Sequence, residues 1–173
     1  MKEIHHTCNC SGKQYTFKEW CEWLKSNDSD SVQAIHKCFS FNIHDVCLTP
    51  NKVVEWENKY CKFQIFTAQS PNGRWDYGLN DNYHFSCHRH GATFINKATD
   101  GFLSEKEAVY AALFETERHC KRIIGETIRR NYTEDDDTEM KTSVILPYLK
   151  QALKQIEKYK EIFNPKQIEL WNL

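Results

Sequence analysis

The tight turn Ser70-Pro71-Asn72-Gly73 constrains the fold of this chain more than any other stretch of the sequence. Proline presets φ for the first central position, asparagine tolerates the second, and glycine takes the left-handed position that follows. The turn therefore predicts a hairpin between YCKFQIFTAQ and RWDYGL. Its register pairs Gln69 with Trp75, Thr67 with Tyr77, and Ile65 with Leu79. All of these residues share one face with Cys61 and Phe63, which is the agreement that a hairpin requires.

Further elements follow from hydrophobic periodicity and capping signals. After the hairpin we expect a third strand, YHFSCHRHGATF, and a helix over residues 104–125 that begins with a capping box of Ser104 and Glu107. We expect Trp75 and Tyr77 to be buried against this helix. Capping signals also predict an N-terminal helix from Thr16 and a second short helix from Asp30, and VVEW is a candidate strand. A last helix covers about residues 143–163, with Pro147 in its first turns.

These elements predict a single α+β domain over residues 1–173. A three- to four-stranded antiparallel sheet is covered by helices on one face, and a C-terminal helix either completes that cover or mediates self-association. The chain divides into four parts: an N-terminal helical, Cys/His-rich part (1–58), a βββα core (59–125), a charged linker (126–141), and a C-terminal helix and tail (142–173).

The composition limits the cellular compartments and the classes of partner that we expect for this protein. The net charge of −1 and the pI near 6.7 exclude a global electrostatic attraction to nucleic acid, so such a surface would have to be local. The N-terminus has no apolar signal segment, and no apolar run approaches the length of a membrane span. With eight Cys and no signal, we expect a cytoplasmic protein with free thiols and no membrane partner.

Eight Cys and eight His raise the question of a metal. The possible ligands are His5, His6, Cys8, Cys10, Cys21, His44, Cys47, Cys87, His88 and His90. Their spacings are CxC, HxxC and HxH, whereas structural zinc is usually held by two short pairs such as CxxC. The sequence therefore predicts no metal and no other cofactor, and a zinc ion at the cluster of His6, Cys8 and Cys10 is the alternative.

Catalytic motifs are missing as well. The sequence has no glycine-rich phosphate loop, no GxSxG and no HExxH, so we expect no enzyme activity. The candidate binding surface is instead a basic stripe along the helix that begins at Ser104, made of Arg118, Lys121, Arg122, Arg129 and Arg130. This stripe is either a surface for a partner or nucleic acid, or only the solvated face of an amphipathic helix. In the nucleic-acid interpretation, bases would stack on Trp75, Tyr77, Tyr83 and Phe85.

The pattern SPNGRWDYGL followed by FLSEKEAVYAAL resembles a small βββα module in uncharacterised accessory proteins of phages and other mobile elements. The resemblance covers roughly residues 60–125. It implies membership of a group that includes anti-CRISPR and other anti-defence inhibitors. We therefore expect a non-catalytic, cytoplasmic binding protein that inhibits a host defence nucleoprotein, with a host protein or ribonucleoprotein complex as its partner. The alternatives are a small RNA-binding protein that uses the basic stripe, and a zinc-stabilised or Cys-dependent enzyme.

Overall fold

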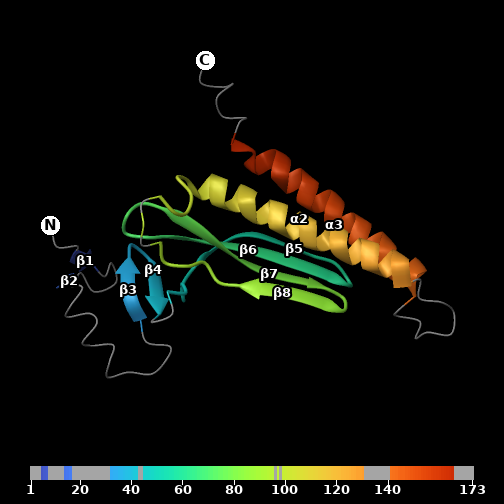
Figure 1. Cartoon of the computed structure of the whole chain (residues 1–173), viewed down its shortest axis with the longest axis horizontal. Coiled ribbons are helices and arrows are strands. Elements are labelled where there is room, and N and C mark those ends of the chain that lie inside the picture. Colours follow the sequence, from blue (N-terminus) through green and yellow to red (C-terminus); the bar gives the residue numbers. More distant parts are fainter. Residues whose placement is uncertain are drawn as a thin grey trace, which may run out of the picture.

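The computed structural model describes residues 5–7, 14–16, 32–42, 45–95, 97, 99–130 and 141–165. The predicted α+β fold is confirmed: helices α2 (Glu105–Arg130) and α3 (Thr142–Phe163) lie on one face of a four-stranded antiparallel sheet (Figure 1). The sheet has the order β5-β6-β7-β8, with strands Asn51–Glu57, Cys61–Gln69, Trp75–Tyr83 and Ser86–His90. Two separate hairpins pair β1 (His5–Thr7) with β2 (Gln14–Thr16), and β3 (Val32–His36) with β4 (Phe39–Asn42).

The turn at residues 70–73 joins β6 to β7 in the predicted register. Gln69 pairs with Trp75, Thr67 with Tyr77, and Ile65 with Leu79. The Gly73 N–H donates to the Ser70 carbonyl oxygen at 2.9 Å, and Gly73 has a φ of 82°, a left-handed value that glycine adopts without a steric penalty. The candidate strand VVEW lies within β5, so both hydrogen-bonding sides of β6 are occupied.

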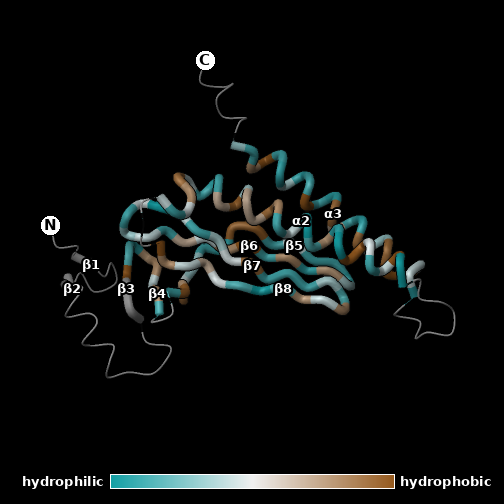
Figure 2. Tube along the Cα trace, in the orientation of Figure 1, coloured by the Kyte–Doolittle hydropathy of each residue, from teal (hydrophilic) through white to brown (hydrophobic). Residues whose placement is uncertain are grey.

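The third predicted strand is shorter than expected. Strand β7 continues through Tyr83, the turn residue His84 has a φ of 50°, and β8 covers only Ser86–His90. This shift places Asp81 directly opposite His88 in the β7–β8 pairing. Figure 2 shows that the edge strand β8 is mostly hydrophilic, in contrast to the hydrophobic stretches of the central strands.

Helix α2 begins at the predicted capping residues. The Ser104 Oγ accepts a hydrogen bond from the Glu107 N–H at 3.2 Å, and the Glu107 carboxylate accepts one from the Leu103 N–H at 3.0 Å. The helix then runs through Arg130, so residues 126–130, which we assigned to the charged linker, belong to α2.

The main core lies between the sheet and the two helices. Helix α2 packs against β6 and β7, and α3 packs against α2 and β6. Helix α3 contributes four fully buried residues to this core, Ile145, Leu149, Ala152 and Ile156, so α3 completes the cover of the sheet. The buried residues are Val54, Cys61, Phe63, Ile65, Leu79, Tyr83, Val109, Ala112, Leu113, Cys120, Ile123, Ile145, Leu149, Ala152 and Ile156. No helix in the described ranges is long and apolar enough to cross a membrane.

A second hydrophobic cluster corrects two expectations. The short helix predicted from Asp30 is wrong, because the residues from Val32 onward form the hairpin of β3 and β4. Every second side chain of a strand points to the same face, and this places Phe39 and Phe41 of β4 together in the second cluster. The burial of these two rings stabilises the hairpin more than the weak capping signal at Asp30 would stabilise a helix. Trp75, which we expected to pack against α2, contacts Phe39 edge to face at 6.0 Å. The helix expected from Thr16 falls outside the described residues, apart from Thr16 itself, which ends β2.

Candidate metal centre

A carboxylate lies in the core between the sheet and α2. Asp81 lies on the same, core-facing side of β7 as Leu79 and Tyr83, and its side chain is 0% exposed. An ionised carboxylate at such a position is costly unless it is paired or binds a metal ion. Its Oδ2 has no hydrogen-bond partner, and the Thr116 hydroxyl donates to Oδ1 only at a long 3.5 Å. Asp81 is therefore an incompletely satisfied buried charge.

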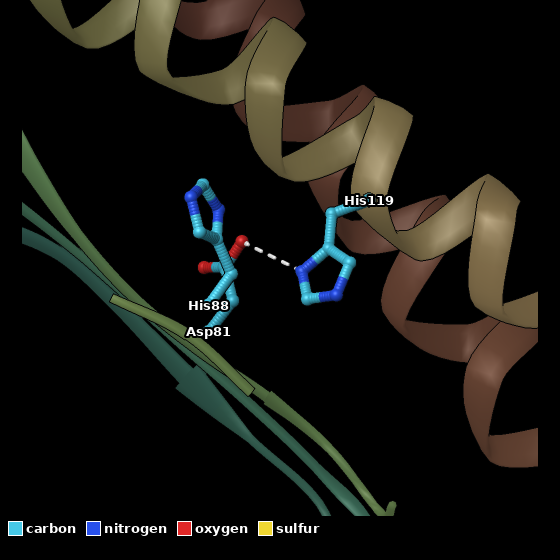
Figure 3. A group of neighbouring side chains, drawn as sticks. All are labelled: Asp81, His88 and His119. Carbon is cyan, nitrogen blue, oxygen red and sulfur yellow. Dashed lines mark ion pairs between the residues drawn. The ribbon is translucent and has the colours of Figure 1, made fainter. Parts of the chain in front are cut away.

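Two histidines from different elements surround this carboxylate (Figure 3). His88 comes from β8, where the sheet register places it opposite Asp81. His119 comes from the inward face of α2, one helical turn after Thr116, and its side chain is 6% exposed. One ligand atom from each of Asp81, His88 and His119 lies within 4.8 Å of the other two.

The distances within this group do not correspond to ordinary hydrogen bonds. His119 Nδ1 lies 3.7 Å from Asp81 Oδ2, beyond the range of an N–H···O hydrogen bond, and both atoms are buried without a partner. On the other side of the ring, His119 Nε2 lies 3.2 Å from the Ser86 Oγ. Two ligands of a tetrahedral zinc ion would lie about 3.3–3.5 Å apart. A contraction of a few tenths of an ångström would thus bring the two unpartnered atoms to ligand spacing.

The electrostatics of the site also favour a bound cation. Burial raises the pKa of Asp81 above its ordinary value, and the neighbouring His119, Thr116 and His88 only partly offset this effect. The raised pKa means that the ionised carboxylate lacks adequate stabilisation from the protein. A divalent ion would supply the missing positive charge.

A second group of potential ligands shares one member with the first. His88, His90 and Glu115 also lie within 4.8 Å of one another, but all three are half-buried. Here the carboxylate already has partners, because the Tyr77 hydroxyl donates to Glu115 at 2.7 Å and His88 Nε2 lies 3.6 Å from it. Since the first group contains two buried residues, Asp81 and His119, and the unpartnered atoms, it is the stronger candidate for a metal centre.

The predicted basic stripe lies on the exposed side of α2. Lys121 pairs with Glu117 at 2.5 Å and Arg122 pairs with Glu126 at 2.7 Å, each one turn apart on the helix. Arg129 and Arg130 lie in the last turn, and Arg130 contacts the ring of Phe85. The carboxylates reduce the net charge of the stripe, so Arg118, Lys121, Arg122, Arg129 and Arg130 do not form a uniformly basic surface.

Two residues of the basic stripe, Arg118 and Arg122, and two of the candidate metal ligands line one surface pocket of about 380 Å³. Its lining residues are Cys87, His88, Glu115, Arg118, His119 and Arg122. Of the four aromatic residues expected to stack bases, Tyr83 is 0% exposed and therefore unavailable, while Trp75, Tyr77 and Phe85 are half-buried.

Sequence reasoning found only part of this arrangement. It considered His88 and His90, but it missed Asp81, Glu115 and His119. The side chains of His5, His6, Cys8, Cys10, Cys21 and His44 lie outside the described residues. A usable signal existed for Asp81, because the predicted hairpin register, continued along β7, already placed this carboxylate on the core-facing side.

A scan against protein-family models, a search of curated proteins and a search of solved structures each found no significant match to this chain.

Proposed function

We propose that this protein binds a divalent transition-metal ion through Asp81, His88 and His119, and that the ion is zinc. The observation that carries the proposal is the pair of buried, unpartnered atoms, Asp81 Oδ2 and His119 Nδ1, that face each other at 3.7 Å. Imidazole nitrogens and a carboxylate oxygen are ordinary zinc ligands, and three protein ligands leave one position open.

The contacts of His119 support this proposal over a simple ion pair. Its Nε2 lies beside the Ser86 Oγ, and a hydrogen bond there directs Nδ1 toward Asp81. Metal-bound histidines commonly donate their second ring N–H in this way, which fixes the orientation of the ring. An ion pair between His119 and Asp81 involves only two of the three side chains, whereas a metal centre uses all three.

A nucleophilic serine is the second candidate function of the same residues. His119 lies between the Ser86 hydroxyl and the buried Asp81 carboxylate, which is the arrangement of the catalytic groups in a serine hydrolase. However, the 3.7 Å between His119 Nδ1 and Asp81 Oδ2 is too long for the hydrogen bond that orients the histidine in such a triad. Covalent labelling of Ser86 by a fluorophosphonate would favour the hydrolase.

Metal content and affinity test the proposal directly. The full chain is purified without chelator and its metals are quantified, and the stripped protein is then titrated with zinc in competition with a chromogenic chelator. We expect one tightly bound equivalent in the unaltered protein and at least a tenfold weaker affinity in His88→Gln and His119→Gln, because each variant removes one of the three ligands.

His84→Asn is the matched control, because it removes a neighbouring histidine outside the group and asparagine tolerates the positive φ of this turn residue. It should bind zinc like the unaltered protein. Circular dichroism in chelator checks that each variant is folded. If the stripped protein takes up no zinc, or if folded His119→Gln binds zinc as tightly as the parent, the proposed site is wrong. Zinc bound elsewhere in the chain would be unaffected by both ligand variants.

Inhibition of a host defence nucleoprotein and a cytoplasmic location stay predictions from the sequence. A metal centre on a small α+β scaffold is compatible with a binding protein of that kind, since bound zinc can organise a contact surface without catalysis. RNA binding through the whole basic stripe has less support, because Lys121 and Arg122 are paired with carboxylates and Tyr83 is buried.

A further inference from the structure

We infer that the pocket beside the metal centre binds a phosphate monoester group, which Arg118 and Arg122 hold against the metal ion. The inference rests on the proposed metal site and goes beyond it by naming the chemical class of the ligand. Two of the three metal ligands, His88 and His119, line the same pocket as the two arginines. The pocket therefore borders two of the residues that would hold the ion, and His88 is the more exposed of the two.

The two arginines are spaced to act on one ligand. Arg118 and Arg122 lie one turn apart on α2, where residues four positions apart are neighbours on the helix surface. Arg122 is already held by Glu126 and by Ser86, so its guanidinium is positioned at the pocket. Among the described residues, no carboxylate lies within ion-pair distance of Arg118, which leaves its fork of donors available for an anion. A guanidinium matches phosphate geometry with two parallel hydrogen bonds.

The charge of the pocket favours an anion. Two guanidinium groups and a divalent ion are balanced in part by the carboxylates of Asp81, Glu115 and Glu126, the last of which pairs with Arg122. Asp81 would be a ligand of the ion, and Glu115 accepts a hydrogen bond from Tyr77 and lies 3.6 Å and 3.8 Å from nitrogens of His88 and His90. The remaining positive charge is about one unit, and a phosphate monoester, which carries about −1.5 to −2 at pH 7, neutralises it. A carboxylate has two oxygens, whereas a phosphate monoester has three acceptor oxygens and can contact the ion and both arginines at once.

The size of the pocket limits what is attached to the phosphate. A volume of about 380 Å³ is at the small end of ligand pockets, which is suitable for a phosphate with a compact substituent. Free phosphate and the phosphate of a mononucleotide share this chemistry. Both are therefore tested, and the substituent is contributing to recognition only if the mononucleotide binds more tightly.

The experiment uses full-length protein loaded with one equivalent of zinc and freed of excess metal. Inorganic phosphate and adenosine monophosphate are titrated by calorimetry, with adenosine as the uncharged control. We expect phosphate and the mononucleotide to bind and adenosine not to bind. The double variant Arg118→Gln/Arg122→Gln should weaken both affinities at least tenfold while zinc content stays at one equivalent. Arg129→Gln removes an arginine from the same helix outside the pocket and should bind like the parent.

The outcomes separate this inference from the proposed function. Zinc-loaded protein that does not bind either phosphate ligand overturns the phosphate inference and leaves the metal site intact. Equal phosphate affinity in the double variant and the parent also overturns it, because the arginines would then have no part in binding. A protein that takes up no zinc overturns both proposals. Phosphate affinity that is unchanged by chelator overturns the placement of the phosphate against the metal.

Discussion

Replacement of Asp81 by asparagine should change stability in opposite directions with and without metal. In chelator, Asp81→Asn removes a carboxylate that is fully buried and has one unpartnered oxygen. An unsatisfied buried charged group costs roughly 1–3 kcal/mol or more, so the variant should be at least as stable as the parent and about 1 kcal/mol more stable at pH 8. In zinc, the parent gains stability that the variant lacks, because the amide is a much weaker ligand.

The pH dependence follows from the raised pKa of Asp81, whose main cause is burial. Below the pKa of an unfolded aspartate, about 3.9, the group is protonated in both states and contributes no difference. As the pH rises from there to the higher folded pKa, the unfolded state ionises first and the folded state loses relative stability. The advantage of Asp81→Asn in chelator should therefore be absent at the acidic end, grow through this window and be constant above it.

The size of the zinc effect can be calculated by mass action. Free zinc at a hundredfold excess over its dissociation constant stabilises the folded parent by about 2.7 kcal/mol. For a chain of this length, that corresponds to a rise in Tm of about 5–11 °C. Differential scanning fluorimetry with and without zinc, from pH 4 to pH 8, measures both effects. The reasoning is refuted if Asp81→Asn is clearly less stable than the parent in chelator, or if zinc raises the Tm of both proteins equally.

Two further predictions concern the fold. Gly78→Ala should lower the free energy of unfolding by about 1–3 kcal/mol, because an added Cβ would lie 2.7 Å from the Ala92 nitrogen. Gly125→Ala should raise it by about 0.5–1 kcal/mol, because an added Cβ would have nothing within 4 Å and alanine favours the helix. Urea unfolding measures both, and shifts in the same direction would contradict the packing around Gly78. Iodoacetamide should label the exposed Cys38 and Cys87 in the native protein, while Cys47, Cys61 and Cys120, whose thiol pKa burial raises to about 11, 12 and 12, react only after unfolding. Peptide mapping distinguishes the sites, and rapid native labelling of Cys61 would contradict its place in the core.

The β6–β7 hairpin was predictable because its information is local. The residues 70–73 specify the turn, and the turn specifies the register, which then places every side chain of both strands on a face. The same holds for α2 and α3, whose apolar stripes lie within each helix, and for the capping residues at the start of α2. The β3–β4 hairpin was missed because Asp30 and the apolar residues after it fit both a helical and an alternating pattern over a short stretch.

The metal centre was not predictable from spacing because its ligands come from three elements. His88 and Asp81 meet only through the β7–β8 pairing, and His119 joins them only through the packing of α2 on the sheet. A search for short ligand pairs finds the HxH of β8, but it cannot find a carboxylate from the neighbouring strand. The informative feature was a charged residue at a core-facing position, which has to be paired or to bind an ion.

The architecture around the centre argues that metal binding serves function more than folding. A single cluster of fifteen buried hydrophobic residues joins the sheet, α2 and α3, so the described part of the chain has a core that does not depend on an ion. Structural zinc sites typically have four protein ligands and stabilise domains that lack such a core, whereas functional sites have three ligands and an open position. Asp81, His88 and His119 follow the second pattern and border a pocket that contains Arg118 and Arg122. Removal of the metal should therefore abolish ligand binding while the protein stays folded.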